Sequence, residues 1–187
     1  LPGVPHIGQI DKKVVRQHAF AIREHTVLRT AVVGTENPHA ADKLMWNAYY
    51  IGGWVGGRSV PLNVWGPSGP REDLGTEYAL THWKEALAWD RQNRVGRLPA
   101  PGGELVIHEF DYRGENQVVY DANGVVIRSF PAIHGIDGSV SYSLEWNGLK
   151  FVFSSDTYPN KWFIDYAKDA DLVVHECFIA VPDLVNK

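Results

Sequence analysis

The stretch from residue 149 to residue 176 constrains the fold of this chain more than any other part of its sequence. Phe151-Val152-Phe153 predicts a buried strand, and residues 171–176 predict a second one. Between them, Pro159 favours the start of a helix. Apolar side chains recur there at helical spacing: Trp162, Phe163, Tyr166, Ala167 and Ala170. Strand, helix and strand in this order form a βαβ-type unit, which normally lies in a sheet covered by helices.

Two Asn-Gly pairs, Asn123-Gly124 and Asn147-Gly148, predict β-hairpins before that unit. Asn-Gly is the strongest short hairpin signal, because both turn residues tolerate a positive φ. Each pair joins two predicted strands, 116–120 with 125–130 and 139–146 with 149–153. In the third of these strands alternate apolar residues share one face: Val140, Tyr142, Leu144 and Trp146.

The residues before the hairpins predict a mixed architecture. Residues 61–67 predict a short buried strand closed by a Gly-Pro turn, 73–92 a helix and 104–112 a strand. A chain of 187 residues with 44% hydrophobic residues fits one domain, over 1–187, with a substantial core. The predicted fold class is therefore a layered α/β or α+β protein.

Composition argues against several classes of protein. No apolar run is long enough to cross a bilayer and no signal-peptide core is present, so we expect no membrane partner and favour the cytoplasm, with other compartments left open. The net charge of -4 argues weakly against a protein dedicated to nucleic acid. The single cysteine, Cys177, excludes internal disulfides and Cys-rich zinc modules. The eight histidines direct the search to metal ligands.

Polar residues follow three of the predicted strands. His134 comes after the 125–130 strand, Asp156 after the 149–153 strand, and His175-Glu176 closes the last one. Strand ends at one edge of a sheet converge, and layered α/β proteins place their sites there. Imidazole nitrogen and carboxylate oxygen suit zinc, manganese or iron, and one Asp can bridge two ions.

Each of these residues also has a structural interpretation. His134 is compatible with a hydrogen-bonded structural role, and His175-Glu176 with a surface pair. Asp156 precedes a predicted helix and is compatible with an N-cap, a position that Thr157 or Asn160 can also fill. Spacing alone leaves these alternatives open.

Four segments together resemble the metallo-β-lactamase superfamily. Residues 151–157 and 170–176 resemble the F-S-G-D-T and A-D-L-L-x-H-E-A motifs of the branch that contains tRNase Z. His134 followed by residues 141–144 resembles the H-x(n)-[SG]-Y-R-[LI] motif of that branch, and residues 61–67 resemble its P-L-x-[VI]-[WY]-G-P strand. The strings WGPSG and SSDTYPNKWF are closer still to a bacterial subgroup identified as guanitoxin-biosynthesis-type metallo-hydrolases.

The resemblance implies a four-layer αββα metallo-β-lactamase sandwich, here incomplete at both ends. It makes His134 a ligand of one metal ion and Asp156 the ligand shared by two. His175 then lies beside the metals as a proton donor or orienting group, and Glu176 occupies the next position of the same motif. Asp156, His175 and Glu176 form the implied catalytic set.

The resemblance also implies two Zn²⁺ ions, with Mn²⁺ or Fe²⁺ as alternatives, and a metal-activated hydroxide that attacks the substrate. We expect the substrate to be a small molecule with an ester, lactone or related bond. The net charge is negative, and the tRNase Z group grips tRNA with a basic arm. In this chain the corresponding region is the acidic-leaning 73–90 helix. The first alternative is a tRNA 3′-processing phosphodiesterase. A homodimer is compatible with either activity.

The sequence departs from the superfamily in one motif that matters. The H-x-H-x-D-H signature, which supplies two ligands to each metal, is absent, and the nearest string keeps only His18. Residues 13–43 resemble nothing in the superfamily, and Ser155 stands where it usually has Gly. A reduced ligand set lowers metal affinity, so an inactive remnant is the second alternative.

Overall fold

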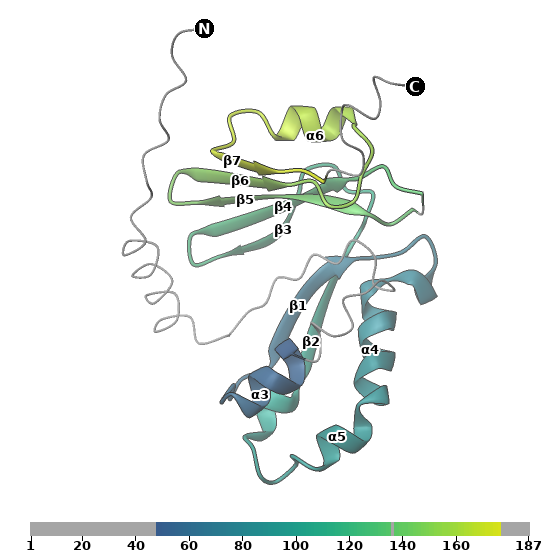
Figure 1. Ribbon diagram of the computed structural model, residues 1–187, viewed down its shortest axis with the longest axis vertical. Coiled ribbons are helices and arrows are strands. Elements are labelled where there is room, and N and C mark those ends of the chain that lie inside the picture. The colour runs from purple at the N-terminus through teal and green to yellow at the C-terminus, as the bar shows by residue number, and fades with distance from the viewer. Residues whose placement is uncertain (1–47, 136, 177–187) are drawn as a thin grey trace, which may run out of the picture.

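The computed structural model describes residues 48–135 and 137–176, which form two β-sheets with helices packed on them (Figure 1). The larger sheet has five strands in the order β3-β4-β5-β6-β7, and the smaller sheet pairs β1 with β2. Residues 13–43 and Cys177, which the sequence singled out, lie outside the described residues.

The larger sheet contains both predicted hairpins. Its strands are β3 (Gln117–Ala122), β4 (Val125–Pro131), β5 (Val140–Trp146), β6 (Leu149–Phe153) and β7 (Leu172–Val174). Asn123 and Asn147 have φ angles of 56° and 51°, and the glycines that follow them have φ angles of 75° and 76°. Two positive φ angles in succession are what a type I′ hairpin turn requires. The Asn-Gly prediction is therefore confirmed at both sites.

The two faces of the larger sheet pack against different layers. Three residues of the predicted apolar face of β5, Val140, Tyr142 and Leu144, form a core with Ile127, whereas the fourth, Trp146, is exposed. The rings of Tyr142 and Phe110 meet edge to face with centroids 6.4 Å apart. On the opposite face, Phe130 and Val152 pack against Phe163 of α6 (Lys161–Tyr166). Helix and smaller sheet thus cover opposite faces of the same strands.

The smaller sheet pairs β1 (Leu62–Pro67) in parallel with β2 (Leu105–Phe110), and α4 (Thr76–Ala86) covers it. Leu80 of α4 packs into a buried cluster with residues of β1. A side chain at Gly66 would clash with Thr76, whose hydroxyl donates to the carbonyl oxygen of Pro67 at 2.8 Å. The glycine near the end of β1 therefore lets the helix approach the strand closely.

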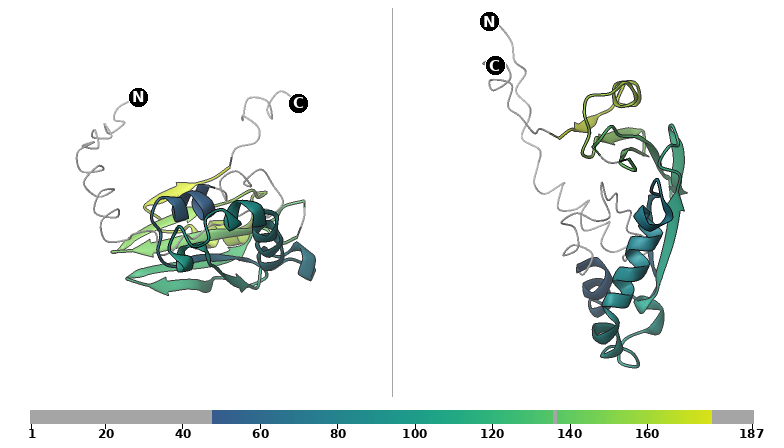
Figure 2. Two further views of the ribbon diagram at one scale, coloured as in Figure 1. Left: turned by 90° about the horizontal axis from the view of Figure 1, so that it is seen from below. Right: turned by 90° about the vertical axis from the view of Figure 1, so that its right-hand side faces the viewer.

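The predicted 73–92 helix is divided into three pieces. A 3₁₀ turn (Glu72–Leu74) precedes α4, and α5 (Ala88–Gln92) follows it after Leu87, which has a φ of -91° and a ψ of 11°. The prediction is right about helical character and wrong about continuity. Figure 2 shows that α4 and α5 lie along one side of the smaller sheet.

Arg58 organises the end of the molecule near α3 (Gly53–Val55), a π-helical turn (Ala48–Gly52) and a 3₁₀ turn (Ala100–Gly103). Its side chain is 1% exposed, and its guanidinium donates to the carbonyl oxygens of Tyr49, Tyr50 and Gly102 at 2.6, 2.7 and 3.0 Å. Burial lowers the pKa of this guanidinium below its usual value. We call Arg58 and these three carbonyl partners the Arg58 cluster.

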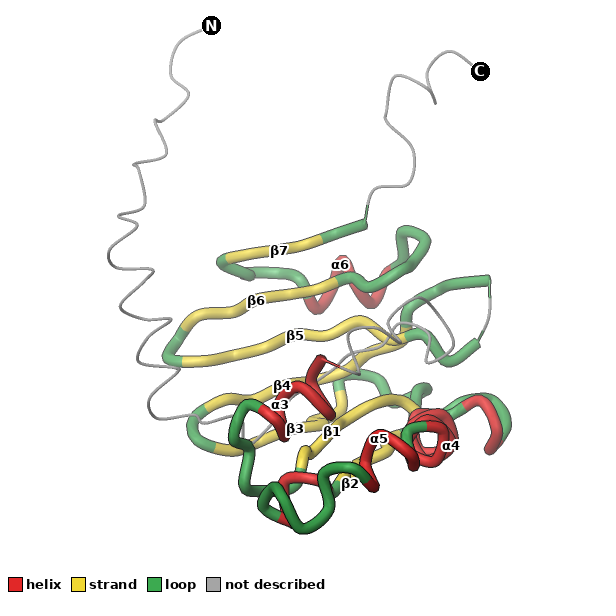
Figure 3. Tube along the Cα trace, turned by 60° about the horizontal axis from the view of Figure 1, so that its bottom comes forward, coloured by secondary structure: helices red, strands yellow, loops and turns green. Residues whose placement is uncertain are grey.

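Helix α6 packs on the larger sheet and α4 covers the smaller sheet, so helices and sheets are mixed, which confirms the α+β class (Figures 1 and 3). Among the described residues, no helix has the length and apolar character needed to span a bilayer.

Candidate metal site at the carboxyl ends of the strands

Three strands of the larger sheet end at the same edge. β4 and β6 are both antiparallel to β5, so they run parallel to each other, and β7 runs parallel to β6 (Figure 1). His134, Asp156 and His175 follow the carboxyl ends of these three strands. The topology therefore brings the predicted site residues to one edge, where α/β proteins bind ligands.

His134 and Asp156 are in direct contact. The Nε2 atom of His134 lies 3.1 Å from Oδ2 of Asp156, and the two side chains are 31% and 46% exposed. The expectation that these two side chains share one location is met, while their role as metal ligands stays a prediction.

Asn160 is the N-cap of α6. Its backbone is extended, and its Oδ1 accepts from the backbone N–H of Phe163 at 2.9 Å. This is the arrangement that satisfies a free N–H in the first turn of a helix. Asp156 is therefore not needed as the cap, and the structural alternative for this carboxylate is excluded.

Thr157 joins the segment of His134 to the turn of Asp156. It is 3% exposed, and its Oγ1 accepts from the backbone N–H of Ile133 at 2.8 Å and from Nδ2 of Asn160 at 3.0 Å. The backbone N–H of Tyr158 donates to the carbonyl oxygen of Ile133 at 2.7 Å. Hydrogen bonds thus connect Ile133, which precedes His134, to Thr157 and Tyr158, which follow Asp156. Sequence reasoning considered Thr157 only as a cap and missed this contact.

Glu176 holds the same turn from the other side. Its Oε1 accepts from the backbone N–H of Thr157 at 2.6 Å, and its own N–H donates to Oγ of Ser154 at 3.0 Å. The backbone N–H of Ser154 in turn donates to the carbonyl oxygen of Val174 at 2.9 Å. This carboxylate fixes the backbone next to Asp156. Its predicted catalytic role is not addressed by these contacts.

His175 packs beside α6. Its ring meets Phe163 edge-on with centroids 4.8 Å apart, and its Nδ1 lies 2.7 Å from the carbonyl oxygen of Glu176. A carbonyl oxygen only accepts, so Nδ1 carries a proton and Nε2 stays outside this contact. In the part of the chain that the structure describes, His175 makes no hydrogen bond with His134 or Asp156.

Ser155 adopts the left-handed backbone conformation, with a φ of 57°. Glycine adopts this conformation without steric cost, whereas a residue with a Cβ is strained there. The structure thus gives the reason for the glycine that the resemblance places at this position. Ser155 therefore adopts the backbone conformation of the turn before Asp156 at a conformational cost that glycine would avoid.

The donors of the pair suit a divalent ion, but they are few. Imidazole nitrogen and carboxylate oxygen are ligands that zinc accepts, and catalytic zinc sites use three protein ligands. Within residues 48–135 and 137–176, no cluster of three or more His, Cys, Asp and Glu side chains is present that would hold a metal ion. His134 and Asp156 therefore fit a metal ion as two of its ligands and do not by themselves complete its coordination.

Comparison with solved structures defines the class of fold. The metallo-β-lactamase fold protein YhfI from Bacillus subtilis is similar over 87% of this chain, with 14% sequence identity and a TM-score of 0.51. The short form of human tRNase Z (ELAC1) is similar over 84%, with 12% identity and a TM-score of 0.59. The chain has a metallo-β-lactamase fold.

The two similar structures are longer than this chain. The match covers 56% of YhfI and 61% of the human tRNase Z. No protein-family model and no curated protein matches the sequence. The comparisons therefore establish the fold, and the activity has to be argued from the residues.

Proposed function

We propose that this chain is part of a metal-dependent hydrolase whose metal site includes His134 and Asp156. The observation that supports this function is the 3.1 Å contact between His134 Nε2 and Asp156 Oδ2, at the edge where β4 and β6 end. Hydrogen bonds between the flanking backbones hold the two segments together before any ligand arrives. Such preorganisation lowers the cost of binding.

Each residue of the site has a defined task in this proposal. His134 and Asp156 bind the ion, and Asp156 is the ligand shared by two zinc ions if both are present. A bound zinc ion supplies Lewis acidity and lowers the pKa of a coordinated water. Glu176 positions the Asp156 turn through the N–H of Thr157, and His175 protonates the leaving group.

A small organic ester, lactone or related molecule is the proposed substrate. The net charge of -4 disfavours a polyanionic partner. The similarity to tRNase Z keeps one competitor, a tRNA 3′-processing phosphodiesterase of the same branch.

Metal binding tests the proposal most directly. Zinc titration of the metal-free 187-residue chain, followed by calorimetry and elemental analysis, is expected to give at least one bound equivalent. His134→Ala and Asp156→Asn are each expected to weaken zinc binding by at least about tenfold. His82→Ala is the matched control, because His82 is an exposed histidine whose Nδ1 lies 2.8 Å from the carbonyl oxygen of Tyr78 in α4.

The outcomes separate the three functions. Less than one equivalent of zinc, or equal affinity in the His134→Ala and His82→Ala variants, contradicts the proposal and favours the inactive remnant. Zinc-dependent cleavage of aryl esters or lactones favours the small-molecule hydrolase. Binding of a 3′-extended tRNA that weakens steeply with added salt favours the phosphodiesterase.

A further inference from the structure

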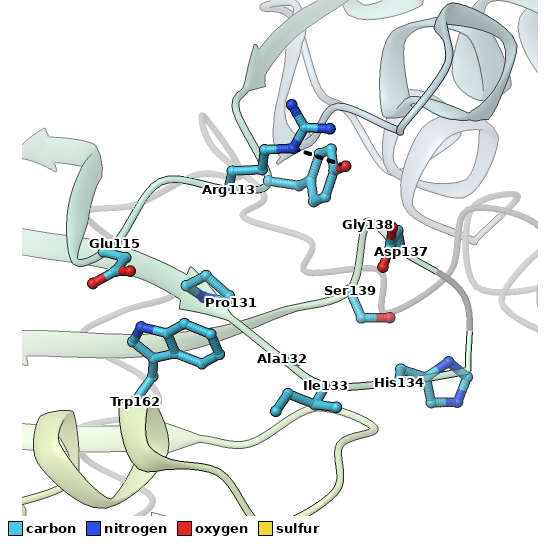
Figure 4. Close-up of a pocket in the computed structure, with 11 residues that line it drawn as sticks. Arg113, Glu115, Pro131, Ala132, Ile133, His134, Asp137, Gly138, Ser139 and Trp162 are labelled. Atoms are coloured by element: carbon cyan, nitrogen blue, oxygen red, sulfur yellow. Dashed lines mark hydrogen bonds between the residues drawn. The ribbon is translucent and has the colours of Figure 1, made fainter.

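A cavity of about 320 Å³ opens beside His134, and the function proposed above assigns it no task (Figure 4). It lies between the loop after β2, the end of β4 and the first turn of α6. His134 lies at one end of the cavity, and Trp162 and Pro131 lie at the other (Figure 4). A ligand in it would therefore reach from a wall of rings to the candidate metal pair.

The far end of the cavity has two flat, fixed walls. The indole of Trp162 packs against the buried Phe130, Val152 and Phe163 cluster, which holds it on α6. Pro131 is the last residue of β4, and its ring has little freedom to move. Rigid apolar surfaces of this kind favour a planar aromatic ring, which stacks or meets them edge to face.

The two charged residues that line the cavity near this end have opposite signs: Arg113 and Glu115, both from the β2–β3 loop. Arg113 is already engaged, because its Nε donates to the hydroxyl of Tyr112 at 3.0 Å. The Nζ of Lys161 lies 5.0 Å from the centre of the Trp162 ring but is not part of the cavity wall. Asp137 lines the cavity at the other end, near His134. The wall around Trp162 therefore carries no net charge that would select a charged ring.

The volume limits the size of the ligand. Sites for drug-sized molecules occupy about 300–1,000 Å³, so this cavity is at the lower limit. It holds one ring with a short substituent rather than a polymer. This argument favours a small substrate over a nucleic acid strand.

We propose that the cavity binds the neutral aromatic ring of a small substrate, with the ring against Trp162 and the cleavable bond toward His134. The orientation rests on the hydrolase function proposed above, whereas the preference for a neutral ring rests on the cavity alone. Trp162 is then a specificity-determining residue, because it contacts the substrate and takes no part in the reaction at His134.

Benzyl alcohol is a suitable probe, since it combines one ring with a short neutral substituent. It is titrated into the metal-free chain while the indole N–H signals are followed by NMR, and the Trp162 signal is assigned from its loss in Trp162→Phe. We expect the Trp162 signal to shift. Trp162→Leu should raise the dissociation constant about two- to tenfold, whereas Trp162→Phe, which keeps a ring, should change it less.

Two further variants serve as controls for the Trp162 test. Trp146→Leu is the matched control, because Trp146 is an exposed tryptophan at the far end of β5 and should leave benzyl alcohol binding unchanged. Ile133→Ser removes part of the cavity wall at a residue that is 44% exposed, so it should weaken binding without unfolding the protein. Absence of binding, or equal weakening in Trp162→Leu and Trp146→Leu, overturns the proposal.

Charged analogues test the second part of the inference. Benzylammonium and benzoate have nearly the shape of benzyl alcohol and carry opposite charges. Neither should bind more tightly than benzyl alcohol, and a tenfold preference for either ion contradicts a neutral ligand. Zinc titration is run in parallel: zinc binding without ring binding defeats this inference and leaves the proposed function intact, and the reverse result defeats the proposed function alone.

Discussion

The Arg58 cluster and the turn around Thr157 both bury polar groups, and these groups find different kinds of hydrogen-bond partner. Arg58 is 1% exposed and Thr157 is 3% exposed. At Arg58, the terminal nitrogens of one charged side chain meet three backbone carbonyl oxygens, two from the neighbouring Tyr49 and Tyr50 and one from Gly102. The Nε atom of Arg58 has no partner among the described residues. At Thr157, a hydroxyl and a backbone N–H bind a backbone N–H, an amide and a carboxylate within one sheet edge.

The difference shows how to tell a structural polar cluster from a reactive one. The guanidinium of Arg58 is enclosed, so it has no contact with solvent through which to act on a ligand. Beside Thr157, the buried groups hold only the backbone, and the side chains of His134 and Asp156 remain 31% and 46% exposed. When hydrogen bonds within the turn hold its backbone in place, the side chains that point outward stay available to bind a ligand.

Removing the charge of Arg58 should have the largest effect. Arg58→Met keeps much of the length and apolar character of the side chain and leaves three carbonyl oxygens without their donor. Loss of several buried hydrogen bonds of a charged group costs about 3–5 kcal/mol. Urea unfolding should show this loss, and zinc binding to the variant that remains folded should be unchanged.

The control for this change is Arg97→Met, because Arg97 is exposed and should alter stability by less than about 0.5 kcal/mol. Equal stability of the two variants would show that the Arg58 cluster does not hold the fold. A specific loss of zinc binding in folded Arg58→Met would mean that the two regions are coupled, and the comparison above would fail.

Much of the larger sheet was predictable, because its signals are local. The Asn-Gly turns need only two residues with positive φ, and the alternation in β5 needs only a period of two. The 73–92 helix was harder, since its apolar spacing continues across Leu87 while the backbone there leaves the helix. Arg58 carried no signal, because its partners at positions 49, 50 and 102 are backbone atoms that any residue supplies.

In the candidate site, too, some features could be predicted from the sequence and others could not. The convergence of His134 and Asp156 followed from strand direction and from motif resemblance, both of which the sequence records. The contacts of Thr157 did not, because a hydroxyl group bonds the backbone in many geometries. Asn160 was one of three N-cap candidates that the sequence left open, and the structure selects it.

Thr157→Val should have the second largest effect, and a different kind of effect. Valine has nearly the shape of threonine but cannot accept from the N–H groups of Ile133 and Asn160. Leaving these donors unsatisfied costs about 1–2 kcal/mol. Because the tie between the two segments is lost, hydrogen exchange at the Ile133 N–H should accelerate more than exchange in the smaller sheet.

Thr157→Ser is the matched control, because it keeps Oγ and should restore most of the protection at Ile133. The Thr157 contacts are local, so this effect should be confined to the edge that carries His134 and Asp156. Uniform acceleration across both sheets would contradict a local role and would place Thr157 with Arg58 as a general stabilising residue.

Tyr142 provides an internal test of what an unsatisfied buried group costs. Its hydroxyl is buried and has no hydrogen-bond partner within the described residues. Tyr142→Phe removes this group and keeps the ring against Phe110. An unpaired buried hydroxyl costs about 1 kcal/mol or more, so the variant should be about 1 kcal/mol more stable in urea unfolding at neutral pH.

The same substitution has a signed pH dependence. Burial raises the pKa of Tyr142 well above its usual value of 10.0. The unfolded chain therefore releases this proton near pH 10 while the folded chain retains it, and the stability of the unmodified protein falls as pH rises above 10. Tyr142→Phe should lose less stability in that range. An equal loss in both proteins would mean that the hydroxyl is hydrogen-bonded or hydrated.

Ser155→Gly should have the smallest effect. The left-handed conformation at a φ of 57° costs a residue with a Cβ about 1–2 kcal/mol, whereas glycine loses about 0.5–1 kcal/mol of chain entropy on folding. The difference predicts a gain in stability of about 0.5 kcal/mol, which thermal unfolding can resolve against Asn123→Gly, since Asn tolerates a positive φ better than Ser.

Ser155→Gly also separates the backbone conformation of the site from its metal affinity. The Oγ of Ser155 is buried and unpartnered within the described residues, so removing it deletes no hydrogen bond that holds the Asp156 turn. Zinc affinity should therefore stay unchanged while stability rises. A loss of zinc affinity in Ser155→Gly would show that the strained turn itself sets the position of Asp156, and that the hydrogen bonds through Thr157 and Glu176 are not sufficient to fix it.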